Sequence, residues 1–154
     1  GTLLMRLYAA AFELGGFYDP VGAGTIIEKG KERRIIDGRE YVLQKPLRPD
    51  VGLIKAHRAD RMGNLSYHKA ARGANPIIAM ASKLTIVEVD EIVEVGEIDP
   101  EIVVTPGVYV DRIVKKPEGS VGSAKHMEDL VTAAMESEIL RRVVLGPARE
   151  GGRK

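Results

Sequence analysis

The sequence has no cysteine and no tryptophan, and only 5% of its 154 residues are aromatic. Without cysteine the chain has no disulfide, no thiolate nucleophile and no cysteine-ligated metal, a pattern typical of reducing compartments that favours a cytoplasmic location. No apolar run approaches the about 18 residues of a membrane-spanning helix, so no membrane segment is predicted. The net charge of only +1 gives no indication of binding to nucleic acid or to an anionic membrane.

What the sequence does contain is typical of one globular domain. Hydrophobic residues make up 44% of the chain and charged residues 29%, which is close to the average for globular proteins. We predict that residues 1–118 form the domain. Residues 119–127, which contain glycine and serine, are predicted to be a linker. Residues 128–154 are predicted to form an amphipathic C-terminal helix with a tail.

Helices and strands are predicted to alternate along the domain. Helical spacing of apolar residues predicts a helix over Thr2–Glu13 with Thr2 as its N-cap, and Asn75-Pro76 is predicted to open a second helix that Asn75 caps. The predicted strands are residues 25–43 with a hairpin at Asp37-Gly38, then 51–56, 65–68, 84–89 and 108–114. This alternation predicts an α/β fold, with an open parallel or mixed sheet and flanking helices.

A turn with polar side chains follows the strand predicted at residues 51–56. Asp60 and Asn64 flank this turn, and Gly63 is predicted to have a positive φ. Because open α/β sheets bind ligands at the carboxyl ends of their strands, one interpretation is a substrate-binding turn. The other interpretation is that Asp60 and Asn64 only close the turn with side-chain hydrogen bonds.

A glycine-bearing loop follows the first predicted helix. Gly22-Ala23-Gly24-Thr25 resembles part of a phosphate-binding loop, but it lacks the third glycine of a dinucleotide fingerprint and no strand clearly precedes it. Phe17 and Tyr18 come just before it. They either line a ligand pocket or anchor the loop as ordinary packed aromatics.

Histidines and charged side chains elsewhere favour a surface role. His57 and His68 are not spaced as a metal-binding pair, and no metal site is predicted. The basic residues Lys55, Arg58 and Arg61 either bind the phosphates of a ligand or form a solvated face, and the second interpretation is preferred. The acidic residues are predicted to be exposed along a strand edge and the following turn; they are Glu88, Asp90, Glu91, Glu94 and Glu97.

Four stretches of the sequence resemble the A (alpha) subunit of the family I CoA-transferases of the 3-oxoacid type. They are Gly1-Thr-Leu with Gly22-Ala-Gly-Thr25 and Glu28-Lys-Gly-Lys31; Ile36-Asp-Gly-Arg-Glu-Tyr41; Ala56-His-Arg-Ala-Asp-Arg-Met-Gly-Asn-Leu65 continuing to Asn75-Pro-Ile-Ile-Ala-Met-Ala81; and Glu88-Val-Asp-Glu-Ile-Val-Glu-Val-Gly96 followed by Thr105-Pro-Gly-Val-Tyr-Val-Asp111. The family's Gly-Gly-Phe loop, and the Gln that helps to stabilise its oxyanion, would precede Gly1. The resemblance therefore implies the C-terminal two-thirds of such a subunit.

The resemblance implies an enzyme subunit without a catalytic residue of its own. Such enzymes move CoA from an acyl-CoA to a free carboxylic acid through a glutamyl-CoA thioester, and the glutamate belongs to a Ser-Glu-Asn-Gly motif of the B (beta) subunit. This chain lacks that motif, so a hetero-oligomer is implied. No metal or cofactor is implied, because coenzyme A is a substrate. The substrate-binding residues that the resemblance implies are Phe17, Tyr18, Gly22, Gly24, Asp60, Gly63, Asn64 and Asn75.

Departures from the family pattern leave the exchanged acids open. Asp19 stands where threonine is common, Gln44 replaces a common glutamate, and Gly73-Ala74 replace a more usual Asn-Phe pair. An alternative interpretation is a non-catalytic truncated homologue that acts as a binding or assembly module. A stand-alone hydrolase is disfavoured, because the sequence shows no nucleophile with a positioned base.

Overall fold

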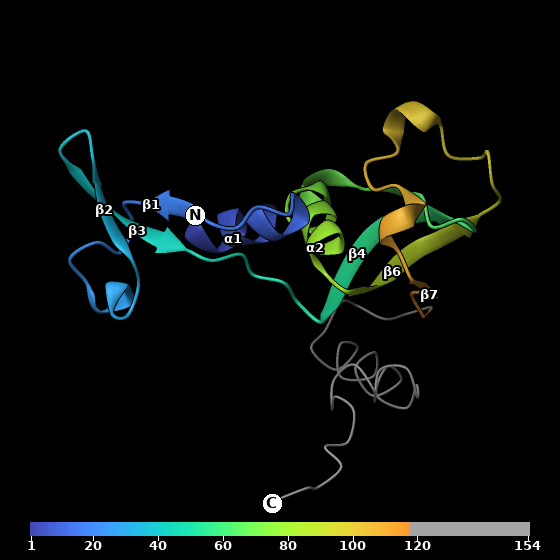
Figure 1. Ribbon diagram of the computed structural model, residues 1–154. Coiled ribbons are helices and arrows are strands. Elements are labelled where there is room, and N and C mark those ends of the chain that lie inside the picture. The colour runs from blue at the N-terminus through green and yellow to red at the C-terminus, as the bar shows by residue number, and fades with distance from the viewer. Residues whose placement is uncertain (118–154) are drawn as a thin grey trace, which may run out of the picture.

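The computed structural model describes residues 1–117 (Figure 1). Its α-helices are α1 (Thr2–Ala11) and α2 (Asn75–Ala81), and its short 3-10 turns are η1 (Ile26–Glu28), η2 (Lys69–Arg72), η3 (Pro100–Ile102) and η4 (Gly107–Tyr109). Its strands are β1 (Phe17–Asp19), β2 (Arg33–Ile36), β3 (Arg39–Gln44), β4 (Val51–Asp60), β5 (Leu65–Ser66), β6 (Leu84–Val93) and β7 (Arg112–Lys115). The predicted linker at 119–127 and the predicted helix and tail at 128–154 lie outside the described residues.

The strands form two sheets that lie at opposite ends of the described chain, with α1 and α2 between them (Figure 1). One sheet is antiparallel, in the order β1-β3-β2. The other has the order β5-β4-β6-β7, in which β4, β6 and β7 are parallel and β5 is antiparallel to β4. The prediction of a mixed sheet with flanking helices is confirmed.

The β4–β6 pair is the centre of the larger sheet. Val51 pairs with Leu84 and Asp60 with Val93, so the two strands run in register over their whole length. Parallel neighbours need a crossover connection, and α2 supplies it by packing on the sheet. The buried core around this pair consists of Ile54, Ala56, Ala59, Leu65, Tyr67, Ala79, Val87 and Val89.

A second core lies where α1 packs against α2. Leu7 and Ala10 of α1 meet Ile77 and Ala81 of α2, and all four are buried. Ala10 and Ala81 are small, so they leave room in this core for the larger Leu7 and Ile77 side chains. Burying a leucine side chain such as Leu7 contributes about 1.5–3 kcal/mol, so this contact holds α1 on the β4–β6 half of the chain.

The predicted hairpin at Asp37-Gly38 is confirmed. Asp37 has φ +49° and Gly38 has φ +76°, which are the two positive values that a type I′ turn requires. Ile36 and Arg39 form the closing pair of the hairpin between β2 and β3. The two-residue turn therefore sets the register of these two strands.

Both predicted helix caps are wrong, because each side chain finds a partner elsewhere. The N-cap of α1 is Gly1, and the Thr2 hydroxyl instead donates a hydrogen bond of 2.6 Å to the Asp19 carboxylate. The N-cap of α2 is Ala74. Asn75 occupies the first helical position, and its side chain contacts β4 and the preceding loop. Tertiary contacts thus replace the local caps.

The strand predicted at residues 108–114 begins later than expected. Its first part is the turn η4, in which the Tyr109 nitrogen donates to the carbonyl of Pro106 at 3.1 Å. Only the segment from Arg112 onward pairs with β6 as β7. The turn brings Gly107 against the β4–β5 connection, so the backbone becomes extended only after that contact.

Candidate functional site

The turn between β4 and β5 is closed by the Asp60 side chain. Asp60 is 3% exposed, and one carboxylate oxygen accepts hydrogen bonds of 2.9 Å from the backbone nitrogens of Met62 and Asn64. Its other oxygen accepts one of 2.8 Å from the Asn64 side-chain nitrogen. Gly63 has φ +89°, as predicted. The prediction that Asp60 and Asn64 bond within the turn is confirmed.

Asn64 also joins this turn to a distant loop. Its side-chain oxygen accepts a hydrogen bond of 3.0 Å from the backbone nitrogen of Gly107. A Cβ atom at Gly107 would lie 2.0 Å from the carbonyl oxygen of Met62, so only glycine allows the two loops to approach this closely. Both polar atoms of the Asn64 amide therefore have partners inside the chain, and its contact with a substrate stays a prediction.

Asn75 connects the start of α2 to the sheet. Its side-chain oxygen accepts a hydrogen bond of 3.2 Å from the backbone nitrogen of Lys55 on β4, and its nitrogen donates one of 2.7 Å to the carbonyl of Ala71. These bonds place the helix start beside the middle of β4. Asn75 is thus a positioning residue for α2, and its predicted contact with a substrate is not tested by this arrangement.

Phe17 and Tyr18 lie half-buried on β1, in the smaller sheet. The Tyr18 hydroxyl donates a short hydrogen bond to the Glu32 carboxylate, and the Arg34 guanidinium lies 4.8 Å from the centre of the Tyr18 ring. The hydrogen bond to Glu32, and secondly desolvation, raise the pKa of the Tyr18 hydroxyl above its ordinary value. Tyr18 is therefore neutral at physiological pH and serves as a hydrogen-bond donor.

The loop after β1 is held by its own side chains. Gly22 and Gly24 both have positive φ, and the Thr25 hydroxyl donates to the Gly22 carbonyl at 2.7 Å. The Gly24 nitrogen donates a hydrogen bond of 2.7 Å to the Glu28 carboxylate. A carboxylate of the chain itself thus occupies the amide that a phosphate would need, which weakens the interpretation as a phosphate-binding loop.

The basic and acidic sets pair with each other along β4 and β6. Arg58 meets Glu91 at 2.8 Å, and these two residues are direct partners in the parallel register of the strands, as are Lys55 and Glu88. Because each cation lies beside a carboxylate, the solvated-face interpretation is favoured over phosphate binding. The remaining pairs are Lys55–Glu88 at 3.5 Å, Lys55–Asp90 at 3.8 Å, His57–Asp90 at 3.1 Å and Arg61–Glu94 at 2.7 Å.

The prediction that the acidic set is exposed is confirmed for four of its five residues, but the prediction that it follows a strand edge is wrong. The strand that carries most of it, β6, lies between β4 and β7 and is not an edge. Glu88 is only 8% exposed, although the other four carboxylate residues are exposed. Within residues 1–117, no group of three or more histidine and carboxylate side chains could hold a metal ion, and none of the helices there is long and apolar enough to cross a bilayer.

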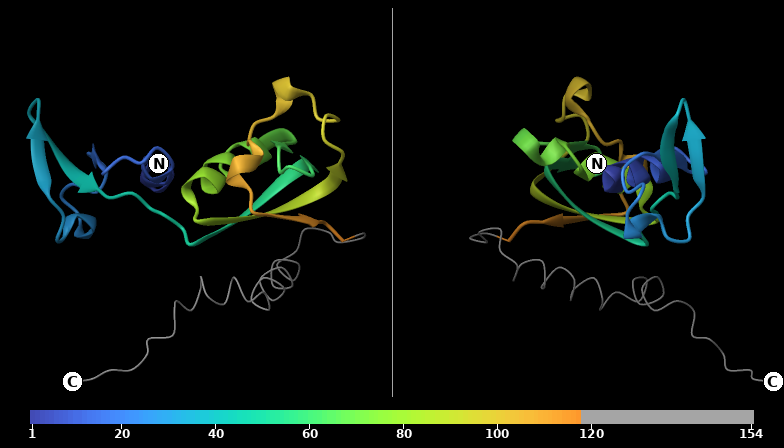
Figure 2. Two further views of the ribbon diagram at one scale, coloured as in Figure 1. Left: turned by 45° about the vertical axis from the view of Figure 1, so that its right-hand side comes forward. Right: turned by 90° about the vertical axis from the view of Figure 1, so that its left-hand side faces the viewer.

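The predicted site residues fall into two separate groups. One group lies on β1 and its loop, and the other lies along β4, in its following turn and at the start of α2. Figure 1 and the left view of Figure 2 show the sheet that contains β1 and the sheet that contains β4 at opposite ends of the described chain. The chain therefore presents two candidate surfaces and does not bring the eight residues into one cleft.

Comparison with known proteins identifies the relatives of this architecture. Residues 1–116 match the model of the coenzyme A transferase family. The chain belongs to this family. It is 54% identical over 114 residues to the A subunit of 3-oxoadipate CoA-transferase from Pseudomonas putida, a match that covers 74% of this chain and 49% of that protein. It is 47% identical over 118 residues to the alpha subunit of acetate CoA-transferase from Escherichia coli K12, a match that covers 77% of this chain and 54% of that protein.

A solved CoA-transferase shares the fold of the chain. The acyl-CoA transferase of Escherichia coli O157:H7 superimposes with a TM-score of 0.68 and 24% identity, over 77% of this chain and 27% of that chain. The resemblance to the A subunit of a CoA-transferase is thus confirmed by the sequence comparisons, and this structure shows that the fold is shared. The chain spans about half the length of the curated relatives it matches.

Proposed function

We propose that this chain supplies part of the A side of a CoA-transferase that moves CoA from an acyl-CoA to a free carboxylic acid. The observation that carries the proposal is the identity of 47–54% to transferase A subunits. Relatives of this kind are named for 3-oxoadipate, acetate and succinyl-CoA:3-ketoacid transfer. We therefore propose succinyl-CoA or acetyl-CoA as donor and a 3-oxo or short-chain acid as acceptor.

The covalent step belongs, in this proposal, to a B subunit. The sequence lacks the Ser-Glu-Asn-Gly motif of the family's glutamate, so the nucleophile that carries CoA as a glutamyl thioester comes from the partner. Coenzyme A is then a substrate, and no further cofactor takes part. We propose a cytoplasmic hetero-oligomer in which the site forms at the junction of the two subunits.

The two groups of candidate residues suit such a junction site, because a site between subunits need not lie in one cleft of either chain. The β4–β5 turn offers a rigid surface, since Asp60 and Asn64 fix its backbone through four side-chain hydrogen bonds. Phe17 and Tyr18 offer aromatic surface for an acyl chain. We propose that the partner subunit closes the space over these surfaces.

A chimera tests this proposal. Residues 1–116 replace the matching segment in the A subunit of Pseudomonas putida 3-oxoadipate CoA-transferase, and the hybrid is purified with the B subunit of that enzyme. We expect CoA transfer from succinyl-CoA to 3-oxoadipate within about tenfold of the parent rate, which corresponds to about 1.4 kcal/mol. The 154-residue chain by itself is the matched control, and we expect no turnover above the blank.

The same experiment separates the alternative function. The alternative is a non-catalytic binding or assembly module. A folded chimera that binds the B subunit but transfers no CoA would support that module and contradict the transferase.

A further inference from the structure

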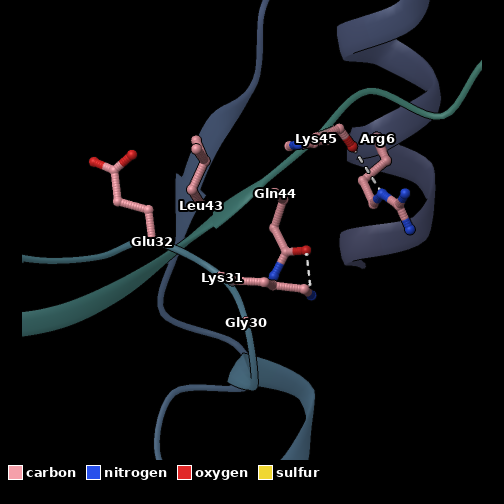
Figure 3. A pocket seen from close by; sticks show the side chains of 7 residues that line it. All are labelled: Arg6, Gly30, Lys31, Glu32, Leu43, Gln44 and Lys45. Carbon is pink, nitrogen blue, oxygen red and sulfur yellow. Dashed lines mark hydrogen bonds between the residues drawn. The ribbon is translucent and has the colours of Figure 1, made fainter.

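A cavity of about 510 Å³ lies where α1, the loop before β2 and the end of β3 meet (Figure 3). It belongs to the smaller sheet, and none of the eight predicted site residues lines it. Its lining is basic on balance, with three cations and one carboxylate. The residues that line it are Arg6, Gly30, Lys31, Glu32, Leu43, Gln44 and Lys45.

Gln44 carries a buried donor without a partner in this cavity. The residue is 2% exposed, and its side-chain oxygen accepts a hydrogen bond of 3.0 Å from the Lys31 ammonium. An ammonium only donates, so the oxygen must face Lys31 and the amide cannot be turned round. Its Nε2 atom is buried and has no hydrogen-bond partner among the described residues. Buried donors are nearly always hydrogen-bonded, so a donor without a partner at this place points to an acceptor supplied by a ligand.

The cations around Gln44 also have bonding capacity left. Figure 3 shows the Gln44 amide between Lys31 and Arg6. The Arg6 Nε atom donates a hydrogen bond of 2.8 Å to the Lys45 carbonyl. Within residues 1–117, none of Arg6, Lys31 and Lys45 forms an ion pair. The single lining carboxylate, Glu32, instead bonds the Tyr18 hydroxyl and the Arg34 guanidinium. The net charge of the lining is therefore positive.

We propose that this cavity binds a small oxyanion, either a carboxylate or a phosphate group. The Gln44 Nε2 atom would donate to one oxygen of the anion, and the Lys31 ammonium and the Arg6 guanidinium would balance its charge. Bonds from charged donors to oxyanions are among the strongest in proteins. A cation would meet three like charges here, and an apolar ligand would leave Nε2 without an acceptor.

Isothermal titration calorimetry of the full 154-residue chain tests this site. Sodium phosphate and sodium acetate are titrated separately at low ionic strength, with sodium chloride as the blank. We expect one saturable site for at least one of the two anions. Saturation by phosphate only identifies a phosphate site, and saturation by acetate only identifies a carboxylate site.

Two variants and one control locate the binding. Lys31→Gln removes a lining cation, and we expect the dissociation constant to rise at least tenfold. Gln44→Glu puts a negative charge in place of the donor, and we expect binding to be lost. Lys29→Gln makes the same charge change at an exposed residue outside the lining, and we expect it to bind as the parent does.

Three results would overturn the proposal. They are the absence of saturable binding by both anions, an equal weakening by Lys29→Gln and Lys31→Gln, and normal binding by a folded Gln44→Glu variant. Circular dichroism establishes whether Gln44→Glu folds. If it does not, Lys31→Gln alone decides, because Lys31 is exposed and we expect this variant to fold.

Discussion

The Asn64 side chain accepts a hydrogen bond of 3.0 Å from the backbone nitrogen of Gly107, which lies 43 residues further along the chain. Beside this bond, Leu65 forms a bridge with Thr105, and Leu65 is fully buried. The side-chain amide of Asn64 thus bonds to Asp60 within the β4–β5 turn and also links that turn to the loop before β7.

Asn64→Ala is expected to lower the free energy of unfolding by about 1–3 kcal/mol, because it removes one bond to a buried carboxylate and one to a backbone nitrogen. Thermal denaturation measures this. In the chimera with its B subunit, we expect folded Asn64→Ala to turn over at nearly the parent rate. A loss of about a hundredfold would instead identify Asn64 as a donor to the substrate.

Gly107→Ala is expected to destabilise the chain by about 3 kcal/mol, since its new Cβ would lie 2.0 Å from the Met62 carbonyl oxygen. Gly96→Ala is the matched control. Gly96 has φ +95°, but a Cβ added there would have no atom within 4 Å, so only backbone strain of about 1–2 kcal/mol applies. Urea denaturation compares the two. Equal losses would show that the loop contact at Gly107 is not tight.

Asp90→Asn is expected to lower the melting temperature near neutral pH but not in acid. The hydrogen bond from His57 lowers the pKa of Asp90 below its ordinary 3.8, and Lys55 and Lys116 act in the same direction. A pKa lowered by folding stabilises the protein above the unfolded-state pKa, and the effect is lost as pH falls through the folded-state pKa. Melting curves of variant and parent should therefore converge below pH 3.8. Glu101→Gln, at an exposed residue, is the control and should show no such convergence.

The outer face of α1 is expected to drive association. Met5 is 49% exposed and Phe12, directly after the helix, is 58% exposed. Seven residues apart, they share one helix face, and exposed apolar surface of this kind is typical of an interface. Light scattering at micromolar concentration should give a mass above the 16.8 kDa of one chain. Replacing both residues by lysine should reduce that mass, whereas Val95→Lys, at a residue 55% exposed elsewhere, should not. A monomeric parent chain would contradict the prediction.

Local signals in the sequence predicted most of the secondary structure. The hairpin at Asp37-Gly38 could be predicted because the two positive φ values that it needs depend only on the residues of the turn itself. The caps at Thr2 and Asn75 were predicted wrongly because their partners, Asp19 and the Lys55 backbone, are distant in sequence. Propensity describes what a side chain can bond nearby, and it does not show which tertiary partner will compete.

The basic cavity was missed for a similar reason. A signal did exist, because Val42 and Gln44 are two residues apart on β3 and so share the buried face of the strand. A polar residue in that position calls for a partner. That the partners are Lys31, and Arg6 nearby on α1, depends on how the loop and helix pack, and no spacing in the sequence contains that information.

The parallel pairing of β4 with β6 also sets an order of folding. The β2–β3 hairpin closes over two residues, and hairpins form in about 1–10 μs. Val51 meets Leu84 only after the chain has closed a loop of 33 positions, which makes such non-local pairing slow. During synthesis the β2–β3 hairpin can therefore be complete before the apolar run at residues 51–56 has paired with β6. Residues 51–56 thus have no partner strand until β6 has been made.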